Sequence, residues 1–286
     1  MAIKIGIIGG SGFYKIGVID VEEEIEIETP FGAPSDKITI GTINDTSVAF
    51  LPRHGKGHAI APHKINYQAN IFALKQCGVE CLVSTAAVGS LKEKIKPCDF
   101  VIAQQLIDRT IKRNATFFEY GIVAHVSFAD PFCKELSDLA YQVVKNKAVN
   151  VHQGTYICID GPQFSTRAES NLYRNWNVDV IGMTLATEAK LAREAEMCLC
   201  GILTVTDYDC WYEKSEDVCV SSVVENLKKN DKNLANIIKE IIPKIKIRKN
   251  CPCQSALDHA IITSPDIIKK HINQQVKNIL LKKYDF

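Results

Sequence analysis

Residues 199–209 read Leu-Cys-Gly-Ile-Leu-Thr-Val-Thr-Asp-Tyr-Asp, an apolar run that ends in two aspartates. The apolar part is typical of a buried strand, and in α/β proteins ligands bind beyond the carboxyl ends of such strands. Aspartate is unfavourable in strands and cores unless another group pairs with it. If the strand continues, Asp207 and Asp209 lie on the same face, because side chains alternate with a period of two.

Two carboxyl groups on one face complement the edge of an adenine ring. An ionised carboxylate accepts from the exocyclic amino group, and a protonated one donates to a ring nitrogen. A second interpretation is that one aspartate caps the next helix and the other is exposed beside it. For an isolated pair with this spacing, the second interpretation is the more common one.

Outward from this stretch, strand patterns alternate with helical patterns, which favours one α/β domain over residues 1–286 with a helical C-terminal elaboration from about residue 220. A turn of small residues is expected at 86–90. We predict strands at 3–8, 37–43, 46–51, 81–84, 155–159, 178–181 and 198–206, and helices at 65–77, 133–147, 166–176, 187–195, 220–242 and 255–262.

The composition is that of an ordinary globular chain, with 286 residues, 46% hydrophobic residues and a net charge of +1. No apolar run approaches the roughly 18 residues that span a bilayer, and the N-terminus does not resemble a signal peptide. The balanced charge argues against a nucleic-acid surface. We therefore expect a cytoplasmic protein that binds neither membrane nor nucleic acid.

Eleven cysteines are many for a chain without a secretory signal. Most lie in apolar contexts, where cysteine behaves as a small hydrophobic residue. Cys251 and Cys253 are separated by one residue, whereas zinc ligands are usually separated by two to four. The sequence therefore predicts reduced thiols and no metal site. The basic segment 239–249 is interpreted as a solvated linker or edge.

Several candidate strands end in residues that suit inorganic phosphate. Backbone amides of Gly-Gly-Ser-Gly at 9–12 can cradle an anion, and the guanidinium fork of Arg53 beside His54 suits phosphate oxygens. A dinucleotide fingerprint at the N-terminus is disfavoured because its third glycine is missing. The candidate phosphate contacts are Ser11, Arg53, His54, the small turn at Ala86 and Ala87, and Thr184.

The remaining candidates suit a planar base and a sugar. Gly-Pro-Gln-Phe-Ser at 161–165 presents the aromatic face of Phe164 beside the hydroxyl of Ser165, and Met183 at a strand end can line a sugar. Phe164 considered alone is more simply a core residue.

In this order, these segments resemble the nucleoside phosphorylase superfamily, and within it the family of purine nucleoside and methylthioadenosine phosphorylases. The resemblance covers roughly residues 3–262. It rests on the segments I-G-I-I-G-G-S-G at 5–12, L-P-R-H-G at 51–55, A-V-G-S-L at 87–91, G-P-Q-F-S-T-R-A-E-S at 161–170, I-G-M-T at 181–184 and T-D-Y-D-C-W at 206–211.

The resemblance implies a twisted mixed sheet, partly closed into a barrel and flanked by helices, in a homotrimer or a hexamer of two trimers. It implies phosphorolysis of 5′-methylthioadenosine with inorganic phosphate as co-substrate and no metal or organic cofactor. Asp207 and Asp209 would serve catalysis and base binding. Other substrate contacts would come from Phe164, Ser165, Met183, Val220 beside the methylthio group, and His125 of a neighbouring subunit.

Three alternatives stay open: a phosphorylase of 6-oxopurine nucleosides, an NAD-binding oxidoreductase, and a nucleoside-binding protein without activity. Asp207 disfavours the first, because relatives that act on 6-oxopurines carry asparagine at that position. One departure concerns phosphate binding. Relatives usually carry serine or threonine where this chain has Ala86, so one hydroxyl is missing.

Overall fold

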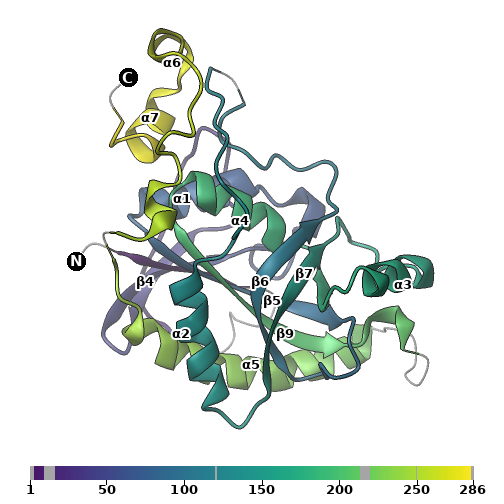
Figure 1. Ribbon diagram of the computed structural model, residues 1–286. Helices are drawn as coiled ribbons and strands as arrows, with labels where there is room; N and C mark the ends of the chain where they lie inside the picture. The colour runs from purple at the N-terminus through teal and green to yellow at the C-terminus, as the bar shows by residue number, and fades with distance from the viewer. Residues whose placement is uncertain (1–2, 10–16, 120, 213–219, 249, 285–286) are drawn as a thin grey trace.

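The fold is seen in a computed structural model that describes residues 3–9, 17–119, 121–212, 220–248 and 250–284 (Figure 1). Its centre is one mixed sheet with helices on both sides. The strands are β1 (Ile5–Gly9), β2 (Asp20–Ile25), β3 (Ile38–Ile43), β4 (Thr46–Pro52), β5 (Cys81–Ser90), β6 (Phe100–Asp108), β7 (Val151–Cys158), β8 (Val180–Gly182) and β9 (Cys198–Asp207).

The sheet closes on itself at one end. Its order is β2-β3-β4-β1-β5-β8-β7-β6-β9, and β9 also pairs with β5. Strands β5, β8, β7, β6 and β9 therefore form a closed barrel, from which β1, β4, β3 and β2 extend as an open wing. This arrangement confirms the predicted mixed sheet that is partly closed into a barrel.

The parallel pair β5–β9 is the seam of the barrel. It runs from Cys81 opposite Cys198 to Val88 opposite Val205, and the register then shifts at Gly89, which lies opposite Asp207. Both strands are buried almost throughout, as expected where both faces of a strand are covered.

The longer helices cover the barrel and the wing. They are α1 (Tyr67–Gln76), α2 (Lys134–Lys145), α3 (Arg167–Asn175), α4 (Leu185–Glu194) and α5 (Val220–Ile241), and α5 runs along β9 (Figure 1). A capping box between Thr166 and Glu169 starts α3. The C-terminal α6 (Pro265–His271) and α7 (Gln274–Leu280) lie beyond α1, away from the barrel. In the part of the chain that is described, no helix is long and apolar enough to cross a membrane.

Two sequence predictions are wrong. Residues 86–90 form no turn, because β5 continues through them, and parallel pairing with β9 outweighs the weak strand preference of Ala-Ala-Val-Gly. The helix expected at 255–262 is absent. A short 3₁₀ turn (Pro252–Ser255) stands there, followed by turns. Strands β2 and β6 and helices α6 and α7 were not predicted.

Candidate active site

A cavity of about 250 Å³ opens at the carboxyl ends of β4, β5, β7, β8 and β9. Ten of the predicted site residues line it, although they come from segments far apart in sequence. They are Arg53, His54, Ala86, Ala87, Phe164, Ser165, Met183, Thr184, Asp207 and Asp209.

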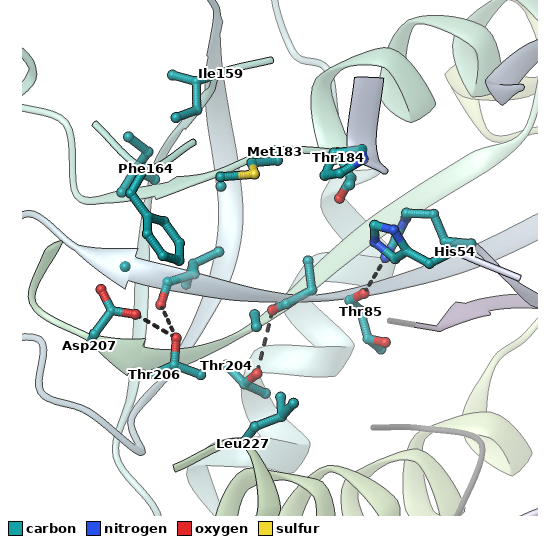
Figure 2. A pocket seen from close by; sticks show the side chains of 18 of the residues that line it. His54, Thr85, Ile159, Phe164, Met183, Thr184, Thr204, Thr206, Asp207 and Leu227 are labelled. Carbon is teal, nitrogen blue, oxygen red and sulfur yellow. Dashed lines mark hydrogen bonds between the residues drawn. The ribbon is translucent and has the colours of Figure 1, made fainter. Parts of the chain in front are cut away.

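The cavity has two chemically different ends. Figure 2 shows Phe164 and Asp207 on one side and His54 and Thr184 on the other, with Met183 between them. One end therefore combines an aromatic ring with carboxyl groups, and the other combines an imidazole with a hydroxyl.

Most of the hydrogen-bond donors of Arg53 are bound to other groups of the protein. Its Nε and Nη2 atoms pair with the carboxylate of Glu188 in α4, Nη2 also donates to Ser84 Oγ at 2.7 Å, and Nη1 donates to the Thr85 carbonyl at 3.0 Å. Arg53 and Glu188 are each about 1% exposed. The guanidinium fork therefore grips a buried carboxylate, which leaves one Nη1 hydrogen without a partner among the described residues.

His54 is held in one tautomer by the loop that follows it. Its Nδ1 lies 2.8 Å from the Ile60 carbonyl, so Nδ1 carries the hydrogen and Nε2 presents a lone pair. Burial, reinforced by the charge of Arg53, lowers the pKa of His54 to about 4. The ring is therefore neutral near pH 7 and is a hydrogen-bond acceptor at Nε2.

Thr184 stands at the start of α4, where helix amides favour an anion. Its backbone N–H is bound to the Tyr156 hydroxyl at 3.0 Å, which holds the helix start against β7. Thr85 also lines this end of the cavity. Its hydroxyl group is not free, because it donates to the Ile8 carbonyl in the neighbouring strand β1 at 3.4 Å.

The two aspartates reach the same cavity by a route that the sequence did not predict. The strand ends at Asp207, and Asp209 lies in a 3₁₀ turn with a left-handed φ of 53°. The Asp209 N–H donates to Asp207 Oδ1 at 2.8 Å, and the Thr206 hydroxyl donates to Asp207 Oδ2 at 2.7 Å. A turn, rather than strand alternation, places both carboxyl groups together.

Burial raises the pKa of both Asp207 and Asp209. Hydrogen bonds from Thr206 and from the Asp209 amide oppose the shift at Asp207. Two buried polar atoms in the lining, Asp209 Oδ2 and Ser165 Oγ, have no hydrogen-bond partner among the described residues. Such atoms are costly unless a ligand or water satisfies them, so they mark a binding surface.

Arg113 joins the two loops that border the base end, a role that the sequence did not indicate. Its Nη1 donates to the Met183 carbonyl at 2.7 Å and its Nη2 to the Asp160 carbonyl at 2.9 Å. It also contacts the Tyr67 hydroxyl at 3.0 Å. Arg113 therefore fixes the positions of Met183 and of the loop leading to Phe164.

Three predicted residues are not placed in this cavity. Ser11 and the side chain of Val220 lie outside the described residues. His125 is exposed, does not line the cavity, and donates its backbone N–H to the Ala260 carbonyl at 2.9 Å. The side chain of His125 is therefore open to solvent in the single chain.

Further lining residues were missed by sequence reasoning. Asp231 stands in the middle of α5, where nothing in the local pattern separates it from a solvent-facing carboxylate. The others are His58, Pro62, Thr85, Val88, Gly89, Ile159, Ile181, Gly182, Thr204, Thr206, Leu227 and Leu234. Among the described residues, the one group with metal-ligand chemistry lies elsewhere, at Cys133, Cys198, Cys251 and Cys253.

Comparison with known proteins agrees with this geometry. Residues 4–243 match the model of the phosphorylase superfamily. The chain is 48% identical over 284 residues to S-methyl-5′-thioadenosine phosphorylase of Koribacter versatilis, covering 99% of this chain and 97% of that protein. It is 50% identical over 261 residues to the protein of the same name from Thermofilum pendens, covering 91% and 99%.

The chain is also similar in structure to solved proteins that carry the same name or a closely related one. A methylthioadenosine phosphorylase from an Antarctic soil metagenomic library superposes with a TM-score of 0.90 at 43% identity, covering 99% of each chain. The methylthioadenosine phosphorylase of Schistosoma mansoni in complex with adenine superposes with a TM-score of 0.86 at 35% identity, covering 92% of this chain and 99% of that one.

Proposed function

Because this chain belongs to the phosphorylase superfamily, we propose that its cavity carries out phosphorolysis of 5′-methylthioadenosine, which yields adenine and 5-methylthioribose 1-phosphate. The relatives from Koribacter versatilis and Thermofilum pendens are named for this substrate. The observation that carries the proposal is one cavity with a half-buried and a buried aspartate beside an aromatic ring at one end, and with Arg53, His54 and Thr184 at the other.

The aspartates would recognise and protonate the base. A phosphate oxygen forms a bond to C1′ of the ribose while the bond from C1′ to N9 breaks and its electron pair leaves with adenine. A proton from Asp207 reaches N7, so adenine leaves as a neutral molecule. The raised pKa of Asp207 favours the protonated form that this step needs. Asp209 Oδ2 is suited to accept from the amino group.

The opposite end would hold phosphate. The hydroxyl of Thr184, at the start of α4, and the remaining Nη1 hydrogen of Arg53 supply donors. Neutral His54 would accept the hydrogen of monohydrogen phosphate at Nε2. Bound phosphate then stabilises the positive charge that develops on the ribose, mainly by electrostatics and proximity. Ser11 and the backbone at Ala86 and Ala87 complete the proposed phosphate contacts.

The sugar would lie between these ends. Met183 and the apolar side chain of Leu227 line the space between them, which suits a thioether better than a charged group. Val220 belongs to this proposed 5′ pocket by resemblance. We also propose a cytoplasmic homotrimer, or a hexamer of two trimers, in which His125 reaches the pocket of a neighbour. The reaction needs no metal or organic cofactor in its chemistry.

Incubation with 5′-methylthioadenosine and with methylthioinosine, each with and without inorganic phosphate, tests the proposal. We expect adenine and 5-methylthioribose 1-phosphate to form only with phosphate, and methylthioinosine to react more slowly. Release of free methylthioribose without phosphate would instead identify a hydrolase. Faster reaction of methylthioinosine would favour the 6-oxopurine alternative.

A further inference from the structure

Four cysteine sulfurs meet at the end of the barrel away from the active site. Cys133 precedes α2, Cys198 is the first residue of β9, and Cys251 and Cys253 flank the start of the short turn after α5. All four Sγ atoms lie within 4.8 Å of one another. The distance from Sγ of Cys251 is 3.8 Å to Sγ of Cys133 and 3.4 Å to Sγ of Cys198.

This spacing is that of a tetrahedral metal site. Zinc–sulfur bonds of about 2.3 Å place thiolate sulfurs about 3.8 Å apart along the edges of a tetrahedron. In a disulfide the two sulfurs are about 2.05 Å apart, so two disulfides would divide four sulfurs into two close pairs. The four sulfurs here form one mutually close group instead.

We propose that Cys133, Cys198, Cys251 and Cys253 bind one zinc ion in a closed structural site. Four thiolates are soft ligands that select zinc over hard cations, and a site with four protein ligands leaves no open position for catalysis. From the sequence alone, the single residue between Cys251 and Cys253 argued against a metal site. The other two ligands, Cys133 and Cys198, lie far away in the sequence, and only the fold brings them close to this pair.

The surroundings suit the charge of such a site. Four thiolates around Zn²⁺ carry a net charge of −2, and a cavity of about 170 Å³ beside three of the cysteines is lined by Lys244, Lys246 and Arg248. Glu135 also lines this cavity and pairs with Arg248 at 2.5 Å. Lys244 likewise pairs with Glu240 at 2.7 Å, so Lys246 is the one cation of this lining without an ion pair among the described residues. The cavity in the basic segment gives the ion access to the thiols.

The proposed ion would anchor the C-terminal region to the barrel. Cys133 already donates its backbone N–H to the Leu199 carbonyl at 2.8 Å, next to Cys198. Nine residue steps of about 3.3 Å separate Cys198 from Asp207 along β9, or roughly 30 Å. The site is therefore structural and distinct from the reaction centre.

Metal analysis of the whole protein tests the proposal. The protein is expressed with added zinc, purified with a reductant and without chelator, and analysed by mass spectrometry for metals. We expect one zinc per chain, and the Co²⁺-substituted protein should show the intense charge-transfer and visible bands of tetrahedral cobalt thiolate. Removing zinc under reducing conditions should lower the melting temperature.

Variants separate ligands from neighbouring thiols. Cys251→Ser, at the half-buried member, and Cys198→Ser should each lose most of the zinc and the cobalt bands. Cys200→Ser, a buried thiol two residues along the same strand, should keep one zinc per chain, as should Cys81→Ser, whose residue pairs with Cys198 across the seam. Circular dichroism checks that each variant is folded.

Three results would overturn the proposal. One is a wild-type protein that stays metal-free in zinc excess while its thiols remain reduced. A second is a metal-free protein whose peptide map, made without reductant, shows disulfides among these four cysteines. Equal zinc loss from Cys200→Ser and Cys251→Ser would also contradict it, because the metal would then not depend on the assigned ligands.

Discussion

Asp207 is the residue expected to choose the base. A carboxylate accepts from an amino group, whereas an asparagine amide can donate to a 6-oxo group. We predict that Asp207→Asn lowers kcat/KM for 5′-methylthioadenosine by about 10²–10⁴-fold, because the proton donor is lost. Activity on methylthioinosine should fall less or rise. Steady-state kinetics on both substrates measure this. Equal losses on both would mean that Asp207 transfers the proton without selecting the base.

Arg53 is expected to matter for folding as well as for phosphate. Arg53→Ala leaves Glu188 buried without its cation, and breaking a buried pair in this way costs about 3–5 kcal/mol. Urea unfolding of the single variant and of the double variant Arg53→Ala with Glu188→Gln measures the effect. The double variant should recover part of the loss. A single variant as stable as wild type would show that Glu188 does not depend on Arg53.

Glu194 gives the stability a dependence on pH. Its carboxylate accepts from the Phe117 N–H at 2.7 Å, yet burial raises its pKa to about 7. Since the folded pKa exceeds the unfolded value near 4.5, the stability that Glu194 provides at low pH is lost as pH rises from about 4.5 to 7. The free energy of unfolding of Glu194→Gln should therefore rise relative to that of wild type across that pH window, by up to about 3 kcal/mol.

The lowered pKa of His54 has the opposite effect on the pH dependence of stability: it destabilises the folded protein in acid. Its folded value near 4 lies below the unfolded value of 6.5, so its contribution lowers stability as pH falls from about 6.5 to 4. Unfolding measurements at several pH values, made on wild type and Glu194→Gln, isolate the carboxylate. A constant difference between the two would mean that Glu194 titrates normally.

Among the elements, β5 places Gly89 directly against Asp207, the carboxyl group proposed to protonate the base. A Cβ atom at Gly89 would lie 2.9 Å from Asp207 Oδ1 and 3.2 Å from Ile181 Cγ2. We predict that Gly89→Ala displaces Asp207 and lowers kcat more than tenfold, since misplacement of about 1 Å can cost about 10²-fold. Enzyme assays with a purified folded variant measure this.

Gly6→Ala in β1 is the matched control for Gly89→Ala. Its added Cβ would lie 2.8 Å from Val79 Cγ1, so it overpacks the core to a similar degree away from the active site. This variant should lose stability and keep its activity per folded molecule. A similar fall in kcat in both variants would attribute the effect to general overpacking.

The elements also show what could be predicted from the sequence and what could not. The apolar run before Asp207 and the capping residues of α3 are local signals, and the corresponding strand and helix were predicted. The left-handed turn at Asp209 and the Arg53–Glu188 pair depend on contacts between distant segments. Local sequence patterns do not determine contacts between distant segments. These features and the cysteine cluster could therefore be recognised only from the three-dimensional structure.

At the scale of the whole molecule, the expected oligomer places one residue of each pocket on a neighbour. Mixing the impaired Asp207→Asn variant with a His125→Ala variant should give more activity on 5′-methylthioadenosine than the two show separately, because some pockets then combine an intact Asp207 with an intact His125. Activity is measured after exchange of subunits, which is followed by native mass spectrometry. Exchange without any recovery would contradict a shared pocket.

Closure of the barrel also determines where the sheet can meet another sheet. Because β9 returns to β5, the strand order leaves β2 as the outer strand of the open wing. This strand reads Asp-Val-Glu-Glu-Glu-Ile and is almost wholly exposed. Its row of negative charges repels a second copy of the same strand, as charged residues on edge strands generally do. The acidity of β2 is thus a safeguard against edge-to-edge aggregation.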